Sequence, residues 1–196
     1  MYDINKFNNL KWSPTQRKSL LKTRIMEVFA QESVSPEGTD SSFIVLDAPS
    51  WVITVAVLNK EQALADFNID EECFLMVTQW RHGNEKLCTE FPGGVIDDGE
   101  NPEVAAKREL LEETGYNANT ITHLATVSPN PAIFSNSLHV YLARDLVNTK
   151  KLQLDHDEFV TATAIPVKEV IKNMGNSDYS HGLMATALMF YIQSQL

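Results

Sequence analysis

Runs of Ile, Val and Phe at strand length, separated by turn-forming stretches such as "SPEGTDS" and "APS", dominate the first half of the chain. Apolar runs of this length, bounded by Gly, Pro, Ser and Asp, indicate β-strands. We expect strands at Arg24 to Glu32, Ser42 to Asp47, Trp51 to Leu58, Phe74 to Gln79, around Leu87 to Phe91, and later at Ile121 to Val127, Leu138 to Ala143 and Phe159 to Ile165. The polar, proline-containing segment Trp12 to Lys22 is expected to be an extended arm.

Helical patterns occur singly among these strands. The segment Pro102 to Thr114 has Asn101 as its expected N-cap, a proline at the first helical position and Gly115 as its stop. Two further helices are expected at Val167 to Asn173 and roughly at His181 to Gln195. Because the helices do not alternate with the strands, the pattern favours an α+β fold, in which helices enclose a mixed sheet, over a doubly wound parallel sheet.

Composition narrows the classes of function. A chain of 196 residues is expected to form one domain with a modest appendage. The formal net charge of −10 argues against a nucleic-acid partner and means that an anionic substrate needs a local cation. No apolar run approaches the roughly 20 residues of a membrane span, and the polar start favours a cytoplasmic location. Cys73 and Cys88 sit beside apolar residues and are expected to be core residues.

The segment from Pro102 to Thr114 places three glutamates close together. At about 100° per residue, Val104, Leu110 and Leu111 are expected on one side of the helix, and Glu109, Glu112 and Glu113 on the other. Like charges three and four residues apart destabilise a helix by a few tenths of a kcal/mol. A solvated acidic face is one explanation. The other is a site for a hard divalent cation, which takes several carboxylate oxygens and a backbone carbonyl.

The neighbouring residues favour the cation site. The spacing Gly94-x5-Glu100-x7-Arg108-Glu109-Leu110-x-Glu112-Glu113-x-Gly115 resembles the complete Nudix box, GX5EX7REUXEEXGU, in which U is a bulky aliphatic residue. Tyr116 occupies the last aliphatic place and is the only departure. The resemblance implies an α/β/α sandwich with a mixed sheet. It also implies hydrolysis of a nucleoside diphosphate linked to another moiety.

The same resemblance implies roles for the residues of the box. Glu109 and Glu113 are the expected principal ligands of Mg²⁺, with Mn²⁺ possible, and Glu112 is a further ligand. The carbonyl oxygen of Gly94 is expected to be another ligand of the metal ion. Glu100 would steady the loop or hold a metal-bound water. Arg108 would orient a glutamate by charge-assisted hydrogen bonds, so it and Glu112 count among the catalytic residues.

Outside the box, the chain resembles the ADP-ribose pyrophosphatase-like branch of the family, from about Trp51 to the C-terminus. The segments that carry this likeness are "SWVITVAVL", "VTQWRHG", "TEFPGGVID", "VSPNPAIFSNSLHVYLA" and "LDHDEF". The branch cleaves nucleoside diphosphate sugars, and ADP-ribose is the first candidate substrate. The expected reaction is in-line attack of a Mg²⁺-activated water on one phosphorus, which yields a nucleoside monophosphate and a sugar phosphate.

Four residues of these segments are expected to contact substrate. Arg81 matches the arginine of the group's "QYR". It is expected either to bind the diphosphate or to be a surface arginine. Glu90 matches a glutamate used near substrate, or is an exposed strand residue. Trp80 could stack on a ring, or lie in the core. Pro131 ends the segment Ser128 to Pro131, which marks this branch.

A general base is expected from the acidic stretch "LDHDEF", about 45 residues beyond the box. Glu158 is the first candidate and Asp157 the second, since the base must lie within hydrogen-bonding distance of the attacking water. His181, at the start of the last helix, is either part of the helix that covers the core or a phosphate contact.

The N-terminal region exceeds a minimal Nudix core. Residues 1–47 are expected to form an arm and strands that make a homodimer, and residues 48–196 the hydrolase domain. Two strands alone are marginally stable, so pairing with a partner is physically reasonable. Two alternatives remain: hydrolysis of another nucleotide, such as a nucleoside triphosphate or dinucleoside polyphosphate, or a Nudix-like module that senses a nucleotide without cleaving it.

Overall fold

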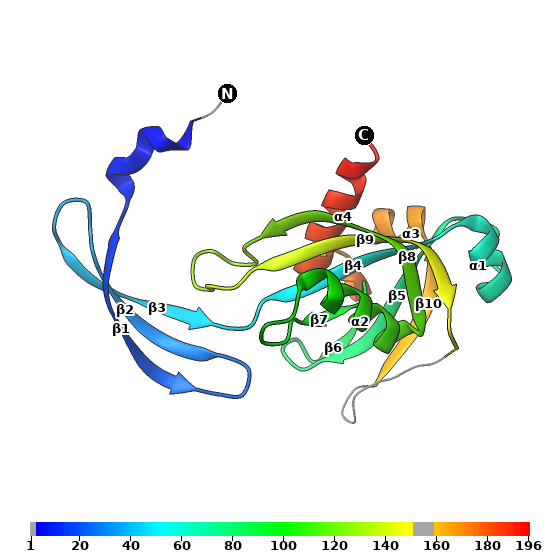
Figure 1. Ribbon diagram of the computed structural model, residues 1–196, viewed down its shortest axis with the longest axis horizontal. Coiled ribbons are helices and arrows are strands. Elements are labelled where there is room, and N and C mark those ends of the chain that lie inside the picture. The colour runs from blue at the N-terminus through cyan, green and yellow to red at the C-terminus, as the bar shows by residue number, and fades with distance from the viewer. Residues whose placement is uncertain (1–2, 151–158) are drawn as a thin grey trace. The chain divides into compact units, whose positions relative to one another are not determined.

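The computed structural model describes residues 3–150 and 159–196 (Figure 1). The chain divides into two compact units. One comprises Met1–Pro49 with Ser128–Asn136, and the other comprises Ser50–Val127 with Ser137–Leu196. The segment after the box thus belongs to the same unit as the N-terminal region, which the sequence did not predict.

The first unit is a three-stranded antiparallel sheet in the order β1 (Ser13–Lys22), β2 (Glu27–Val34), β3 (Asp40–Asp47) within the described residues. A 3-10 helix, η1 (Ile4–Leu10), precedes it. The segment predicted as an extended arm is strand β1, which is extended and also pairs with β2 along its length. The segment Ser128–Asn136 joins the unit through Leu46, whose N–H donates to Ile133 at 2.7 Å and whose carbonyl accepts from the Ser135 N–H at 3.1 Å.

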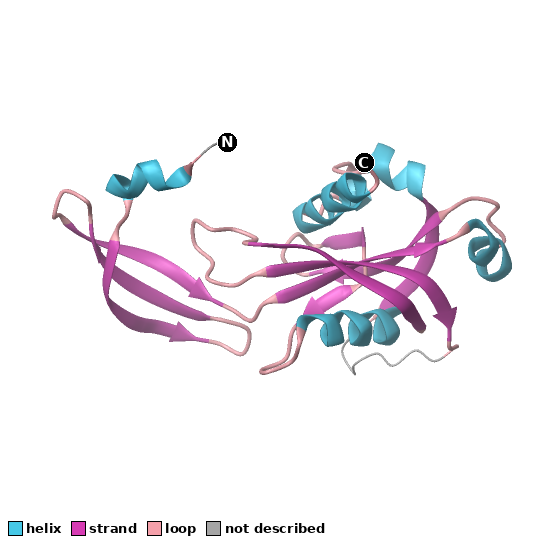
Figure 2. Cartoon of the chain, turned by 45° about the horizontal axis from the view of Figure 1, so that its top comes forward, coloured by secondary structure: helices cyan, strands magenta, loops and turns pink. Residues whose placement is uncertain are grey.

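The second unit is built on a mixed sheet in the order β10-β5-β4-β9-β8, with β6 paired to β5 and β7 paired to β4. The strands are β4 (Trp51–Leu58), β5 (Cys73–Arg81), β6 (Lys86–Glu90), β7 (Gly93–Val95), β8 (Tyr116–Val127), β9 (Leu138–Asn148) and β10 (Val160–Pro166). The pairing of β4 with β9 is parallel, and the others in this sheet are antiparallel. Helices cover both faces, as Figure 2 shows.

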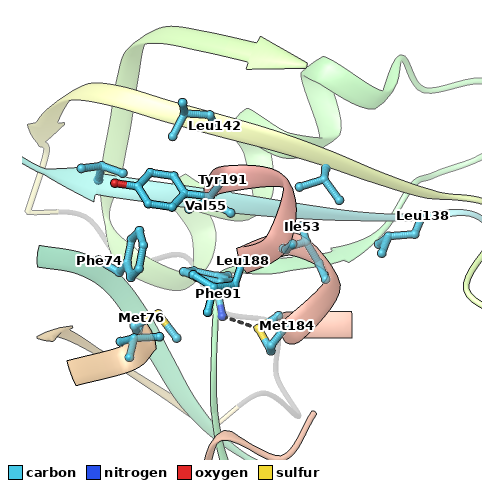
Figure 3. Packing of buried hydrophobic residues seen from close by; sticks show 14 residues of the cluster. Ile53, Val55, Phe74, Met76, Phe91, Leu138, Leu142, Met184, Leu188 and Tyr191 are labelled. Carbon is cyan, nitrogen blue, oxygen red and sulfur yellow. Dashed lines mark hydrogen bonds between the residues drawn. The ribbon is translucent and has the colours of Figure 1, made fainter. Parts of the chain in front are cut away.

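Strand β4 shows why the sheet has helices on both sides. Its apolar run is buried on both faces, and successive side chains of a strand point in opposite directions. Ile53, Val55 and Val57 pack toward the last helix, α4 (Gly182–Ser194), in the cluster drawn in Figure 3. Val52, Ala56 and Leu58 pack into the clusters that contain residues of α1 (Lys60–Phe67) and α2 (Pro102–Thr114).

The helices follow the predicted boundaries closely. Helix α2 has the predicted limits, with Asn101 accepting from the Glu103 N–H and Gly115 as a left-handed cap at φ 75°. Helix α3 (Val167–Asn173) also matches, and α4 begins one residue after His181. Helix α1 was not predicted, although Asn59 and Gln62 form a reciprocal capping box at its start.

This arrangement confirms the predicted α+β class and the α/β/α sandwich with a mixed sheet. Cys73 and Cys88 are buried free thiols, as expected. None of the helices in the described part of the chain is long and apolar enough to cross a bilayer.

Candidate functional site

Helix α2 turns two of its glutamates, Glu109 and Glu113, toward the sheet. Ala105, Ala106, Glu109, Leu110 and Glu113 are buried along one face, and Glu113 is only 3% exposed. The predicted separation of an apolar side from an acidic side is therefore wrong. Val104, expected to anchor the helix, is 55% exposed. Small alanines next to Leu110 provide the anchor instead, and they let the helix approach the sheet closely enough to bury two carboxylates.

The loop before the helix is shaped around these carboxylates. A Cβ built on Gly94 would lie 2.5 Å from Oε1 of Glu109, so this position admits only glycine without movement of the glutamate. The Gly93 N–H donates to Oε2 of Glu113 at 2.9 Å, and Gln79 Nε2 on β5 lies 3.4 Å from Oε1. Backbone and side-chain donors therefore hold Glu113 at the junction of helix and sheet.

Arg108 connects the remaining carboxylates. Its Nε and Nη2 donate to Glu100 at 3.0 and 2.8 Å, and its Nη1 donates to Glu109 at 2.9 Å and Glu112 at 3.0 Å. Nη2 also donates to the carbonyl oxygen of Val95 at 3.1 Å. These bonds lower the pKa of Glu100 below its usual range and raise that of Arg108. The like-charge repulsion along α2 is thus offset by one shared guanidinium.

The donor set suits a hard divalent cation. It consists of carboxylate oxygens one helical turn apart beside a glycine whose backbone closely approaches one of them. Mg²⁺ and Ca²⁺ take such oxygen ligands. Among the residues that the structure describes, no three His, Cys, Asp or Glu side chains are gathered in metal-binding geometry. Arg108 holds Glu109 and Glu112 by hydrogen bonds, so a cation at this place has to share or replace those contacts.

A second charged cluster lies on β5 and β6. Glu90 is 1% exposed, and its carboxylate accepts from Arg81 Nε at 3.0 and 3.2 Å and from Nη2 at 2.5 Å. His181 Nδ1, at the start of α4, lies 3.3 Å from Oε1 of Glu90. Burial raises the pKa of Glu90, but His181 and Arg81 more than offset this and lower it to about 2. Glu90 is therefore a buried carboxylate that remains ionised, and the alternative of an exposed strand residue is wrong.

One cavity of about 620 Å³ joins this cluster to the glycine loop. Its lining includes Arg81, Glu90, Gly93, Gly94 and His181. A hydrogen bond holds helix α4 next to the cavity: the buried Phe91 N–H donates to Met184 Sδ at 2.7 Å (Figure 3). The cavity is large enough for a small-molecule ligand.

Other predicted site residues lie elsewhere. Trp80 is 48% exposed and is not among the residues that line the cavity, so the alternative of a core tryptophan is wrong. Pro131 belongs to the unit that contains the N-terminal sheet. Asp157 and Glu158 lie outside the described residues.

Gln79 and Met184 were not predicted as site residues. The stretch "VTQWR" offered Gln79 as the residue two before Arg81, but nothing in the sequence indicated that it would reach α2. Met184 lies four residues before Leu188 on one helix face, which is the ordinary pattern of a core helix. Its role as a hydrogen-bond acceptor depends on a contact across 93 residues of sequence.

Comparison with known proteins identifies the family. The profile of the NUDIX domain matches residues 53–183, which is more than half of the chain. The chain belongs to the Nudix family. It is 28% identical over 175 residues to an ADP-ribose pyrophosphatase of Bacillus subtilis (strain 168), and this match covers 89% of each protein. It is also 28% identical over 156 residues to a methanol dehydrogenase activator of Bacillus methanolicus, covering 79% of this chain and 78% of the relative.

The solved structures agree on the fold. The crystal structure of an ADP compounds hydrolase superposes with a TM-score of 0.78 at 23% sequence identity, covering 95% of this chain and 97% of the other. These comparisons confirm the predicted likeness to the ADP-ribose pyrophosphatase-like branch of Nudix proteins and the prediction that the protein is a Nudix hydrolase.

Proposed function

We propose that this Nudix hydrolase cleaves the diphosphate bond of a nucleoside diphosphate sugar, with ADP-ribose as the first candidate. One observation carries the proposal: a single cavity is lined by Gly94, which packs against the carboxylate of Glu109, and by Arg81. A cavity that reaches the glycine beside a proposed metal ligand and also contains an arginine suits a diphosphate. The names of relatives, which include an ADP-ribose pyrophosphatase and an ADP-sugar pyrophosphatase, support the sugar nucleotide.

In this proposal Glu109, Glu112, Glu113 and the carbonyl of Gly94 hold a divalent cation, Mg²⁺ first and Mn²⁺ second. Such a cation, when bound, polarises the phosphorus centre and lowers the pKa of a water ligand. Hard cations of this kind are the ones that all-oxygen donor sets prefer. The proposal therefore predicts activity with Mg²⁺ or Mn²⁺.

The remaining residues hold these groups in place. Gly93 and Gln79 orient Glu113 by the hydrogen bonds to its two oxygens. Arg108 orients Glu109 and Glu112 and, through Glu100, ties the preceding loop to the helix, since Glu100 also accepts from the Asp97 N–H at 3.1 Å. Positioning of this kind contributes to rate because small displacements of reacting groups are costly.

Substrate contacts and the base complete the proposed mechanism. Arg81 is proposed to bind the diphosphate, with Glu90 holding the guanidinium in place. Trp80 and Pro131 stay predictions as substrate contacts. The general base is proposed to be Glu158, with Asp157 second, and both lie in the segment outside the described residues. The expected products are a nucleoside monophosphate and a sugar phosphate.

The N-terminal sheet is proposed to form a homodimer. Every residue of β1 is exposed, and the sheet leaves large apolar side chains uncovered. The exposed ones on β1 and β3 are Leu20, Leu21, Phe43 and Ile44. Apolar side chains gathered on an exposed sheet favour a protein partner. Light scattering of the whole protein tests this, and a monomer at micromolar concentration would count against it. A cytoplasmic location and the lack of a nucleic-acid partner also stay predictions.

The test of the proposed function is a substrate panel assayed with Mg²⁺ for phosphatase-sensitive products. It contains ADP-ribose, other ADP- and GDP-sugars, NADH, diadenosine polyphosphates and nucleoside triphosphates. Turnover of ADP-ribose or another sugar nucleotide above the rest is the expected result. Turnover of a triphosphate with no sugar nucleotide cleaved would replace the proposal by the alternative nucleotide hydrolase, and binding without turnover would favour a sensing module.

A further inference from the structure

Glu90 lies between two basic side chains at one wall of the cavity. Its Oε2 faces Arg81 Nη2, while Oε1 faces both Arg81 Nε and His181 Nδ1. The three side chains come from β6, β5 and the residue before α4. This wall is therefore an ion-pair cluster centred on a buried carboxylate.

The pairing has an electrostatic consequence for a phosphate ligand. Arg81 uses two of its nitrogens on Glu90, so the negative charge of that carboxylate offsets much of the arginine's positive charge. The protein has a formal net charge of −10, so the neutralised Arg81–Glu90 pair alone gives a diphosphate little electrostatic attraction. An additional cation at this wall would give the cluster a net positive charge.

His181 is placed to provide that charge. Its Nδ1 is buried and, among the described residues, has no partner in hydrogen-bond geometry, although Glu90 lies 3.3 Å away. The ring lines the cavity and 33% of the side chain is exposed. Because Nδ1 faces Glu90, the other ring nitrogen, Nε2, is the one left to contact a ligand in the cavity.

We propose that His181 is a substrate-binding residue: with Nδ1 facing Glu90, its ring as an imidazolium presents Nε2–H to a phosphate oxygen of the nucleotide's diphosphate. This inference rests on the proposed function. Among the described residues, the ionisable groups that share the cavity with His181 are Arg81 at the end of β5, His82 directly after it, and Cys88 and Glu90 on β6. Of these side chains, His82 is the other imidazole, so it needs its own variant.

The test measures binding of α,β-methylene ADP-ribose by calorimetry from pH 5.5 to 8, once with Mg²⁺ and once with EDTA. This probe is a diphosphate diester without a terminal phosphomonoester, whose second ionisation near pH 6 would obscure the profile. For the wild type, we expect Kd to rise by about tenfold across this range, since a cationic imidazole binds a diphosphate more tightly than a neutral one. In His181→Phe, we expect Kd at pH 5.5 to be about tenfold higher than in the wild type and nearly independent of pH.

Two amide variants distinguish a phosphate contact by His181 from a role of His181 in supporting Glu90 alone. The amide of His181→Asn can reach the place of Nδ1 and keep the Glu90 contact, but has no donor toward the cavity. The amide of His181→Gln reaches the place of Nε2. We expect the Asn variant to bind as weakly as Phe and the Gln variant to bind within about threefold of wild type at pH 5.5, both without pH dependence. Thermal unfolding checks that each variant folds, and the amide pair carries the test if Phe does not.

Failure of this inference and failure of the proposed function give different results. If His181→Asn binds like the wild type with the same pH profile, His181 only supports Glu90 and the inference fails. The same conclusion follows if the pH dependence disappears in His82→Phe and persists in His181→Phe. If the wild type cleaves ADP-ribose but none of the His181 variants changes binding, this inference alone fails. If the wild type neither binds the analogue nor cleaves a sugar nucleotide, the proposed function itself fails.

Discussion

Gly94 and Glu109 are so close that a single methyl group on the glycine would collide with all three atoms of the glutamate's carboxyl group. The distances from a built Cβ are 2.5 Å to Oε1, 2.6 Å to Cδ and 2.8 Å to Oε2. The glycine at the start of the box is therefore needed for space beside a carboxylate. The backbone of the loop and the acid of the helix form one unit of the site.

Substitution of the two loop glycines should separate activity from stability. Gly94→Ala meets the movable end of a side chain, so we expect the fold to survive and kcat to fall by about 100-fold as Glu109 is displaced. Gly93→Ala meets the backbone carbonyl of Val52 in β4, so we expect its free energy of unfolding to fall by about 1 to 3 kcal/mol. Urea denaturation and steady-state kinetics measure both. Equal loss of stability in the two variants would contradict this distinction.

Glu90→Gln should destabilise the protein in a pH-dependent way. Folding lowers the pKa of Glu90 from 4.5 to about 2, so its contribution is complete above pH 4.5 and is lost as the pH falls toward 2. Removing the charge leaves Arg81 unpaired, and at pH 7 we expect a loss on the order of 2 kcal/mol, since that arginine is partly exposed. Urea denaturation at pH 7 and pH 3 should show the difference between variant and wild type shrinking. A constant difference would mean that this carboxylate does not control the effect.

Met184→Leu tests the hydrogen bond from the Phe91 N–H to Met184 Sδ, which holds α4 next to the cavity. Leucine keeps the volume but leaves the buried Phe91 N–H without its acceptor. An unsatisfied buried donor costs about 1 to 3 kcal/mol, so we expect a loss of about 2 kcal/mol in the free energy of unfolding. Met76→Leu, in the same core cluster, is the matched control and should cost less than about 1 kcal/mol. Equal losses would show that the sulfur acts only by packing.

The general base is tested by Glu158→Gln against Asp157→Asn. If Glu158 takes the proton, its variant should lose kcat by about 100-fold or more with little change in KM, while Asp157→Asn remains active. The reverse pattern would transfer the role to Asp157. Full activity in both variants would remove the base from this segment.

The sequence predicted most of the framework because local signals agreed with the tertiary structure. Strand β4 has the predicted limits, since a long apolar run is buried on both faces of the sheet. Helix α2 has the predicted limits, since a cap, a proline and a glycine bound it. Helix α1 was missed because its residues "KEQALADF" carry little apolar periodicity, and only the capping residues around Asn59 indicated it.

The predictions about the site that were wrong concern side chains whose orientation depends on tertiary contacts. Val104 and Leu111 look like anchors by their chemistry, but the alanines and Glu113 face the sheet because Gly93 and Gln79 supply hydrogen bonds there. A helical projection cannot show donors on another strand. Trp80 is exposed for a similar reason, since the alternation of β5 turns the neighbouring Arg81 toward the cavity.

The most direct test of the account compares the wild type with Glu113→Gln on ADP-ribose, with Mg²⁺ and with EDTA. Glutamine keeps the size of a side chain that is held by Gly93 and Gln79 but removes the charge that a cation requires. Removing groups that only orient a ligand costs about 10- to 100-fold, so loss of the ligand itself should reduce kcat by more than about 100-fold. We expect Mg²⁺-dependent release of AMP and ribose 5-phosphate by the wild type, and almost none by a variant that unfolds at a similar temperature. Mg²⁺-dependent cleavage at the wild-type rate by Glu113→Gln would contradict the assignment of α2 as the metal site.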